Sequence, residues 1–599
     1  MKLYRSVLLV LSGCTLAGAA WGTIGETEIT AEEILKHVKY LASNKLEGRR
    51  AGTRGDKKTA RYITREFRSY GLRPMGDSPR SFRHSFEFIS GVKLGRRNRL
   101  EVESVDGTYN LKLHKDYRPV GFSASESAEG RLVFAGYGID SDEPDYHDYD
   151  GIDINGKVVV ILRHSPDGTN PHGDFSRFAA LRYKAMTARE NGASAIIFVT
   201  GPEDDPDEDY LMKLRYDQSF ADSGIPVVMI TQRRAGELIS LAGHDLAEVQ
   251  KRINKDQTPF SFDIPASVQM AASVEKVAAQ SVNLVGVVAG IDPDLANEYV
   301  VVGAHYDHLG WGGEGSLAPD TVAVHNGADD NASGTAGLLE LAQWFSEHPQ
   351  KRSIIFIAFG AEELGLLGSA ALVDDPPFVL ENVVAMINMD MIGRLKDTTL
   401  VVGGAGTSSV WKEMVAQKTG QFNLSPKFDD AGYGSSDHQS FYLKDIPVLF
   451  LFTGTHENYH RPSDDWEFIN VAGEERIVRL AAELIGELAS EPTRPDFVKV
   501  KQEQPTRGGF AVSLGTIPDY AGTDVDGMLL SGVREGSPAD KGGLQADDII
   551  IMLGGKEVQS IYDYMYALQE LKPDKAVPVV VRRDGEEVEL EVTPVRRRE

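Results

Sequence analysis

The chain has 599 residues, of which 41% are hydrophobic and 25% are charged, and its formal net charge at pH 7 is -26. A chain of this length does not form one hydrophobic core, so about three or four domains are expected. The negative charge repels phosphate backbones and anionic lipid headgroups, which excludes nucleic acid from the expected partners.

Residues 1–20 have the pattern of a signal peptide for export. Two basic residues precede the apolar stretch 7–11, which is too short to span a bilayer. Residues 11–14 resemble a lipobox, whereas residues 17–19 have the small side chains of an ordinary cleavage site. Cys14 is the only cysteine, which excludes an intramolecular disulfide and favours the lipoprotein form. We expect a periplasmic or cell-envelope protein whose membrane attachment is a lipid on Cys14, or a secreted protein if the second site is used.

Two helices are predicted after the signal. Apolar residues recur at helical spacing within 34–41 and within 60–67, and Gly71 is placed to end the second helix. Polar connections that contain glycine are expected after it. Residues 24–124 are assigned to the N-terminal part of the main domain.

Residues 125–265 change to short β-like runs separated by turns, with one helix near 179–190. The runs are 132–134, 158–162, 195–199 and 226–230. Because no group of residues here has catalytic spacing, we expect an inserted non-catalytic module.

An α/β pattern extends over residues 270–490. Continuously apolar strands at 299–303, 353–358 and 447–451 alternate with helices such as 335–347, as in sheets that are covered on both faces. A charged linker that contains proline, 491–507, then leads to a last domain at 508–599.

Polar side chains follow the predicted strands of the α/β region. They are His305 and Asp307 after the first strand, Asp329 before the helix, Glu362 and Glu363 after the second strand, Asp390 after the apolar run 383–387, and His460 beyond the last strand. Because ligands gather beyond the carboxyl ends of strands in such sheets, we expect these side chains at one edge of the sheet.

The side-chain types at this edge suit a divalent metal. Two histidines and three carboxylates form a set that zinc accepts readily, and manganese or cobalt would fit the same groups. Asp307 lies two residues after His305 on a strand, so it points to the same side and can accept the imidazole's other N–H. Three further histidines, His308, His325 and His438, are explained at least as well by structural roles.

Five motifs resemble the co-catalytic zinc aminopeptidases, whose type member is bacterial leucyl aminopeptidase and whose relatives include glutamate carboxypeptidase and glutaminyl cyclase. They are Gly-Ala-His-Tyr-Asp at 303–307, Gly-Ala-Asp-Asp-Asn-Ala-Ser-Gly at 327–334, Ala-Glu-Glu-Leu-Gly-Leu-Leu-Gly-Ser at 361–369, Asn-Met-Asp-Met at 388–391 and Tyr-His-Arg-Pro-Ser-Asp at 459–464. The resemblance implies the α/β fold of the zinc exopeptidases, with a mixed sheet flanked by helices.

The same resemblance implies a ligand set for two zinc ions per chain. Asp329 would bridge the ions, His305 and Asp390 would complete one site, and Glu363 and His460 would complete the other. The family also implies a cis peptide bond between Asp329 and Asp330.

Catalytic roles follow from the resemblance as well. Two zinc ions lower the pKa of a bridging water, and Glu362 would act as the general base that accepts its proton. Tyr433 would donate to the developing oxyanion. Gly434 and Ser435 stand where a family member has cysteines beside that tyrosine.

Two other segments resemble accessory domains. Residues 125–265 resemble a protease-associated domain, on motifs such as 134–139 and 188–197, which implies a lid or gating role. Residues 508–599 resemble a PDZ domain of the bacterial protease type, on the motif 532–550. Such domains bind peptide C-termini, and residues 513–517 are the candidate carboxylate loop.

The sequence thus predicts an exported metallo-aminopeptidase that removes N-terminal residues from peptides. A zinc carboxypeptidase or a glutaminyl cyclase would keep the metals and change the reaction. A third alternative is a non-catalytic peptide-binding scaffold, against which stands the full set of five ligands and a base.

Overall fold

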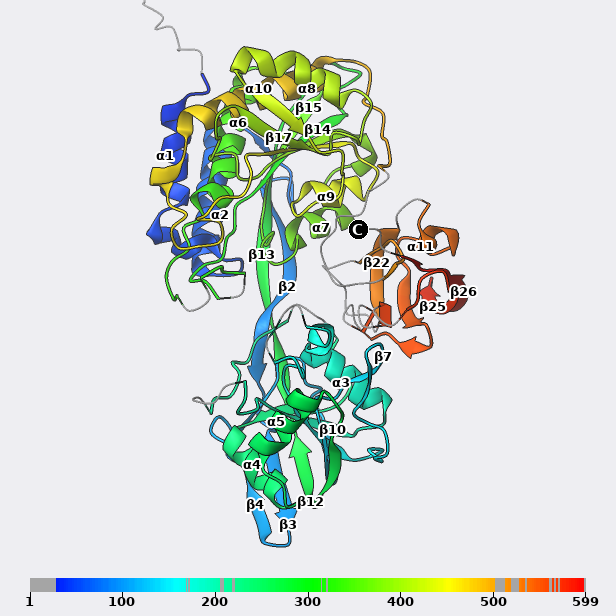
Figure 1. Ribbon diagram of the computed structural model, residues 1–599. Helices are drawn as coiled ribbons and strands as arrows, with labels where there is room; N and C mark the ends of the chain where they lie inside the picture. The colour runs from blue at the N-terminus through cyan, green and yellow to red at the C-terminus, as the bar shows by residue number, and fades with distance from the viewer. Residues whose placement is uncertain are drawn as a thin grey trace, which may run out of the picture.

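The chain forms two large domains and a small C-terminal domain in the computed structural model (Figure 1). The structure describes residues 28–596 apart from 169, 171–172, 205–208, 218–220, 314, 319–320, 501–511, 519–526, 534–535, 560–562, 565–566 and 569–570. The expected signal peptide, with Cys14, lies outside the described residues. Within the described part of the chain, no helix is long and apolar enough to cross a membrane.

The first domain contains a mixed nine-stranded sheet. Its order is β1-β13-β15-β14-β16-β19-β17-β18, and β2 also pairs with β13. The strands are β1 (Arg73–Pro74), β2 (Arg83–Leu94), β13 (Val274–Val288), β14 (Tyr299–His305), β15 (Ser353–Phe359), β16 (Val383–Met389), β17 (Thr399–Gly403), β18 (Ser425–Phe428) and β19 (Val448–Phe452). The four central strands β15, β14, β16 and β19 are parallel, whereas β13 and β17 are antiparallel to their central neighbours. The predicted mixed sheet is confirmed.

Alternate residues of the central strands pack into two cores. On β15, Ile354 and Phe356 belong to one core, and Ile355 and Ile357 belong to the other. The first core includes α1 (Ala31–Leu41), α2 (Arg54–Ser69), α6 (Gly334–Glu347), α8 (Trp411–Thr419) and α10 (Val471–Ser490), and the second includes α7 (Leu367–Asp374) and α9 (His438–Tyr442). Because both faces are covered, all seven residues of β15 are buried.

The two predicted N-terminal helices are present as α1 and α2. Thr30 caps α1 by accepting a hydrogen bond from the backbone N–H of Glu33 at 3.3 Å. Helix α2 ends at Ser69, two residues before Gly71, whose φ of 82° favours a residue without a Cβ. Gly71 therefore ends the helix as predicted.

The second domain contains an eight-stranded sheet in the order β4-β3-β12-β6-β9-β10-β11-β5. Its elements are β3 (Arg99–Ser104), β4 (Gly107–Asn110), β5 (Tyr117–Pro119), β6 (Ser127–Ala135), β7 (Asp140–Asp142), β8 (Asp145–His147), β9 (Val158–Leu162), α3 (Leu181–Glu190), β10 (Ala195–Val199), β11 (Val227–Ile230), α4 (Gln232–Ser240), α5 (Leu246–Asp256) and β12 (Ser261–Ala271). All four predicted β-like runs are strands. The sheet also includes β3, β4 and β5, so this unit begins before the predicted boundary at 125. These strands are short and carry polar residues, which is why they read as connections.

A long two-stranded ribbon connects the two large domains (Figure 1). β2 and β13 pair antiparallel from Arg83 opposite Leu284 to Leu94 opposite Val274, with a register shift after Val277. The other end of β13 pairs with β15 in the first sheet. The chain enters the second domain after β2 and leaves it before β13, so both connections of that domain run through the ribbon.

The C-terminal domain is built mainly from a six-stranded sheet. Its elements are β20 (Val512–Ser513), β21 (Thr516–Pro518), β22 (Met528–Val533), α11 (Pro538–Lys541), β23 (Ile549–Leu553), β24 (Lys556–Glu557), β25 (Val577–Arg583), β26 (Glu586–Val592) and β27 (Val595–Arg596). The candidate carboxylate loop, 513–517, connects β20 to β21. The domain contacts the second domain through an ion pair between Lys556 and Glu190 at 3.1 Å and a hydrogen bond from Arg189 to Gln559 at 2.8 Å.

Candidate metal centre

The carboxyl ends of three neighbouring parallel strands bring the predicted side chains together. His305 is the last residue of β14, Glu362 and Glu363 follow β15, and Asp390 follows β16. His305 is only 1% exposed. This edge is where a parallel sheet collects its ligands, so the strand order explains why residues 85 positions apart are neighbours.

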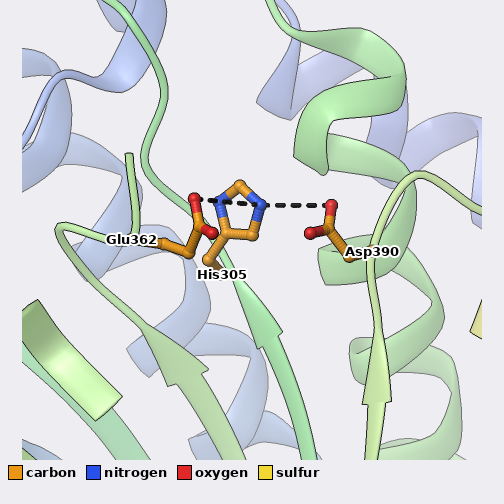
Figure 2. A group of neighbouring side chains, drawn as sticks. All are labelled: His305, Glu362 and Asp390. Atoms are coloured by element: carbon orange, nitrogen blue, oxygen red, sulfur yellow. Dashed lines mark hydrogen bonds and ion pairs between the residues drawn. The ribbon is translucent and has the colours of Figure 1, made fainter. Parts of the chain in front are cut away.

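His305 lies at the centre of a first group (Figure 2). Its Nε2 is 3.2 Å from Asp390 Oδ1 and 3.3 Å from Asp330 Oδ1. Glu362 lies on the other side of the imidazole in Figure 2, with its Oε2 at 3.9 Å from the same nitrogen. Glu362 is thus beside this group without a hydrogen bond to the histidine.

His460 lies at the centre of a second group. Its Nε2 is 3.2 Å from Asp330 Oδ2 and 3.2 Å from Glu363 Oε2. The two oxygens of Asp330 therefore face the two histidines, one each. Asp330 joins the two groups into one centre.

These distances fit a metal ion within each group. Zinc bonds of about 2.0–2.1 Å at tetrahedral angles separate two ligand atoms by about 3.3 Å. The four distances from His305 and His460 to their carboxylates are 3.2 or 3.3 Å. The side chains are therefore spaced as ligands of two ions, with Asp330 between them.

The structure corrects the predicted role of Asp329. Its Oδ1 accepts hydrogen bonds from the backbone N–H of Gly393 at 2.7 Å and from the Ser333 hydroxyl at 3.2 Å, and its Oδ2 is 3.2 Å from His456 Nε2. The side chain thus points away from His305 and His460. The neighbouring position, Asp330, is the one between the two groups.

The predicted cis peptide bond is displaced by the same single residue. The cis bond lies between Asp330 and Asn331, whereas we expected it between Asp329 and Asp330. The backbone N–H groups of Asp329 and Asp330 both donate to Asp464 Oδ2, at 3.0 and 3.2 Å. This shared carboxylate holds the loop in the register that aims Asp330 at the centre. The sequence has two adjacent aspartates, and the motif alone did not fix which one bridges.

Asp307 contacts the backbone of Glu362 more closely than it contacts His305. Its Oδ1 accepts a hydrogen bond from Glu362 N at 3.0 Å but is 3.8 Å from His305 Nδ1, which is too far for a hydrogen bond. Burial raises the pKa of Asp307 to about 8. The predicted contact with the imidazole is therefore not formed here.

Tyr433 packs edge to face on Tyr442, with ring centroids 4.8 Å apart. It lies beside the second core, which includes Phe441 and Tyr442 of α9. Its role as an oxyanion donor stays a prediction.

The centre concentrates negative charge away from water. Five carboxylates contribute to it, namely Asp307, Asp330, Glu362, Glu363 and Asp390. Burial raises the pKa of Glu362 well above its ordinary value, and the neighbouring Glu363 and Asp390 raise it further while His305 opposes them. Burial lowers the pKa of His460, but its contacts with Asp330 and Glu363 outweigh this and raise the pKa to about 10. Divalent cations would neutralise this buried charge.

Arg49, which the sequence analysis missed, is a buried side chain that hydrogen-bonds the backbone around the centre. Its guanidinium donates to the carbonyl oxygens of Leu41, Tyr306, Asn326 and Gly327 at 2.6–2.9 Å. Burial lowers its pKa to about 10, so it is charged at neutral pH. Three of these carbonyls, those of Tyr306, Asn326 and Gly327, lie more than 250 residues away along the chain, which no local pattern reveals.

Three histidines that the sequence left as structural have different surroundings. His325 is held by Ala323 O at 3.0 Å and by the Ser316 hydroxyl at 2.8 Å. His438 stacks on Phe450 with centroids 4.5 Å apart. His308 differs from both, because its Nδ1 is 2.5 Å from Glu363 Oε1.

Three segments of the chain match the models of known families. Residues 283–485 match peptidase family M28, residues 128–239 match the PA domain, and residues 530–583 match the PDZ domain. Three segments of the chain are therefore similar to an M28 peptidase, a PA domain and a PDZ domain.

Named relatives are aminopeptidases. Aminopeptidase YwaD of Bacillus subtilis is 29% identical over 361 residues, which are 58% of this chain and 66% of the relative. The probable lipoprotein aminopeptidase LpqL of Mycobacterium tuberculosis is 24% identical over 503 residues, which are 80% of this chain and 82% of the relative. The solved structure of BSAP, a zinc aminopeptidase from Bacillus subtilis, has 23% identity and a TM-score of 0.46, and the match covers 78% of this chain and 96% of that one.

The family model is that of a peptidase, and YwaD and LpqL carry the name aminopeptidase. The chain spans just under two thirds of the length of YwaD.

Proposed function

We propose that this protein is an exported aminopeptidase that uses two zinc ions to hydrolyse the N-terminal residue from peptides. The observation that carries the proposal is the position of Asp330, whose two oxygens face His305 and His460 at 3.3 and 3.2 Å. A shared carboxylate of this kind offsets the repulsion between two dications.

The ligands divide into two sets around Asp330. His305 and Asp390 would hold one ion, and Glu363 and His460 would hold the other. When bound, the zinc pair supplies Lewis acidity and a water that ionises near neutral pH. The protein residues then have to position the peptide and transfer protons.

Glu362 is the general base in this proposal. It is buried beside the first group, and burial raises its pKa above the ordinary value of a glutamate, which makes the carboxylate a stronger proton acceptor. Asp307 fixes the backbone of Glu362 through the 3.0 Å hydrogen bond to its N–H. Glu362 would take the proton of the attacking water and pass it to the departing amine, while Tyr433 would donate to the oxyanion.

The proposal also assigns roles to the signal peptide, the PA domain and the PDZ domain. Export would follow from the signal peptide, with a lipid on Cys14 as the favoured attachment. The PA domain would gate access of peptides to the centre, and the PDZ domain would take peptide C-termini near the 513–517 loop.

The test combines metal content with hydrolysis of aminoacyl-p-nitroanilides by native protein, Glu362→Ala and Glu413→Ala. We expect about two zinc ions per chain and cleavage that needs a free α-amine. This cleavage should collapse in Glu362→Ala and persist in Glu413→Ala, which changes an exposed glutamate on α8.

Other outcomes would favour the alternatives. Bound zinc without aminopeptidase activity would redirect the assay to N-blocked peptides and to peptides with N-terminal glutamine, the substrates of a carboxypeptidase and a glutaminyl cyclase. Well-folded protein with neither zinc nor activity would leave the peptide-binding scaffold.

A further inference from the structure

His308 lies three residues after the end of β14 and is 1% exposed. Its Nδ1 is 2.5 Å from Glu363 Oε1 and 3.9 Å from Asp330 Oδ2. Glu363 Oε2, the other oxygen of the same carboxylate, is 3.2 Å from His460. The two oxygens of Glu363 therefore contact two different histidines, Oε1 contacting His308 and Oε2 contacting His460.

The two distances from Glu363 have different physical meanings. Two ligands of one zinc ion are separated by about 3.3 Å, which the contact with His460 matches. The 2.5 Å contact with His308 is too short for a pair of ligands on one ion, and it lies on the short side of the 2.7–2.9 Å that is usual for an N–H···O bond to a carboxylate, so it is a hydrogen bond. His308 Nδ1 is thus a donor to Glu363, while His460 is spaced as a ligand that would share an ion with Glu363.

From this geometry we propose that His308 is a positioning residue for the second zinc ion. It donates its Nδ1–H to Glu363 Oε1 and so aims Oε2 at the ion that His460 also binds. The inference rests on the proposed two-zinc function and adds a residue to it. Ligating carboxylates that are held by such a hydrogen bond bind metal more tightly.

The surroundings of His308 hold its ring in place. A Cβ on Gly327 would lie 2.5 Å from His308 Cδ2, so only glycine leaves room for the ring. The ring also meets His460 edge to face, with centroids 5.8 Å apart. Nε2 is buried and has no hydrogen-bond partner among the described residues, which favours the tautomer with its proton on Nδ1.

One short segment then serves both ions. His305, at the end of β14, would bind the first ion directly, and His308 would orient a ligand of the second. A histidine at 308 is therefore expected to matter for one ion and not for the other.

The experiment measures zinc binding by the full chain, by competition with a chromogenic chelator, for the wild type, His308→Ala and His308→Asn. We expect His308→Ala to weaken one of the two ions by about 10–100-fold and to leave the other unchanged. His308→Asn should restore most of the affinity, because its side-chain N–H can reach the same carboxylate oxygen. The control is His37→Asn, which changes a buried histidine 3.3 Å from Glu340, and both zinc affinities should persist in it.

Several results would overturn the inference. Unchanged affinities in His308→Ala would remove the role, and equal losses in His308→Ala and His308→Asn would indicate a direct ligand instead. Loss of both ions with a lowered melting temperature of the metal-free protein would indicate a structural role. Wild-type protein that binds no second zinc ion overturns the two-zinc function and this inference together, whereas the first three results leave that function standing.

Discussion

Asp330 is the residue on which both halves of the metal centre depend. Asp329, its neighbour, is equally buried and acidic but faces Gly393, Ser333 and His456. The two aspartates therefore form a natural pair for a mutational test, since the same chemical change is made one residue apart.

Asp330→Asn should remove hydrolysis and weaken zinc by more than about 100-fold, because loss of a residue that only supports a ligand already costs about 10–100-fold. Asp329→Asn should keep the zinc and lower the free energy of unfolding by about 1–3 kcal/mol through its lost contacts. Zinc content and urea denaturation of both variants check this. Retention of zinc by Asp330→Asn and its loss from Asp329→Asn would reverse the assignment.

His438 leads to a prediction about how the free energy of unfolding depends on pH. Burial lowers its pKa from 6.5 to about 3, so the unfolded chain binds a proton in this range that the folded chain does not. The stability from this group is complete above pH 6.5 and is lost as the pH falls toward 3. His438→Phe should keep the stack on Phe450 and flatten this loss, which amounts to at most about 1.4 kcal/mol per pH unit. Urea denaturation between pH 7 and pH 4 compares the slopes, and equal slopes would contradict the prediction.

The short helical segment η1 (Asn44–Arg49) carries Arg49 and supports the backbone beside the candidate metal centre. Gly48 has a φ of 68°, and a Cβ there would lie 2.3 Å from Gly310 O. Arg49 donates to Asn326 O and Gly327 O at the start of the 327–330 turn and to Asp330 O, 3.4 Å away, at its end, so η1 holds that turn in place.

Arg49→Met should lower the free energy of unfolding by about 3–5 kcal/mol, because several buried carbonyls lose their donor. The control is Arg50→Met, which changes the adjacent, only partly buried arginine. Urea denaturation measures both variants. Equal stabilities of the two would show that the carbonyls find other donors.

The strands that could be predicted from the sequence are those in which every residue is buried. The runs 158–162 and 195–199 are strands with these same bounds, because every residue in them is apolar and buried. Strand β2 was missed, although Phe86 and Phe88 alternate with polar residues as in a half-buried strand. Its partner β13 lies almost two hundred residues away, which local patterns do not reveal.

In the candidate site, too, the residues with a local sequence signal were predicted and those that depend on distant contacts were not. His305, Glu363, Asp390 and His460 each follow or lie beyond a strand, and the structure brings all four together. The bridging position was displaced by one residue, because adjacent aspartates are equivalent in composition. His308 and Arg49 could not be recognised, since their roles depend on contacts between distant loops.

At the scale of the whole molecule, the PDZ domain rests on the PA domain through Lys556 and Glu190, and both side chains are about a quarter exposed. Lys556→Glu should loosen this contact by up to about 1 kcal/mol, more at low salt, and Glu190→Lys in addition should restore it. Hydrogen exchange of α3 measures the change. Lys572→Glu is the control, because its partner Asp142 is 3.9 Å away and both are highly exposed. No difference between Lys556→Glu and Lys572→Glu would argue against a specific contact.

The ribbon has a mechanical consequence. β13 has 15 residues and is about 50 Å long, and it is anchored at one end in the catalytic sheet beside β15. A displacement of the PA domain by about 5 Å at the far end then tilts the strand by only about 6° at the sheet, by simple lever geometry on that length. The sheet that carries His305 and Glu363 should therefore turn only slightly when the second domain moves, because the displacement is spread over the length of the ribbon.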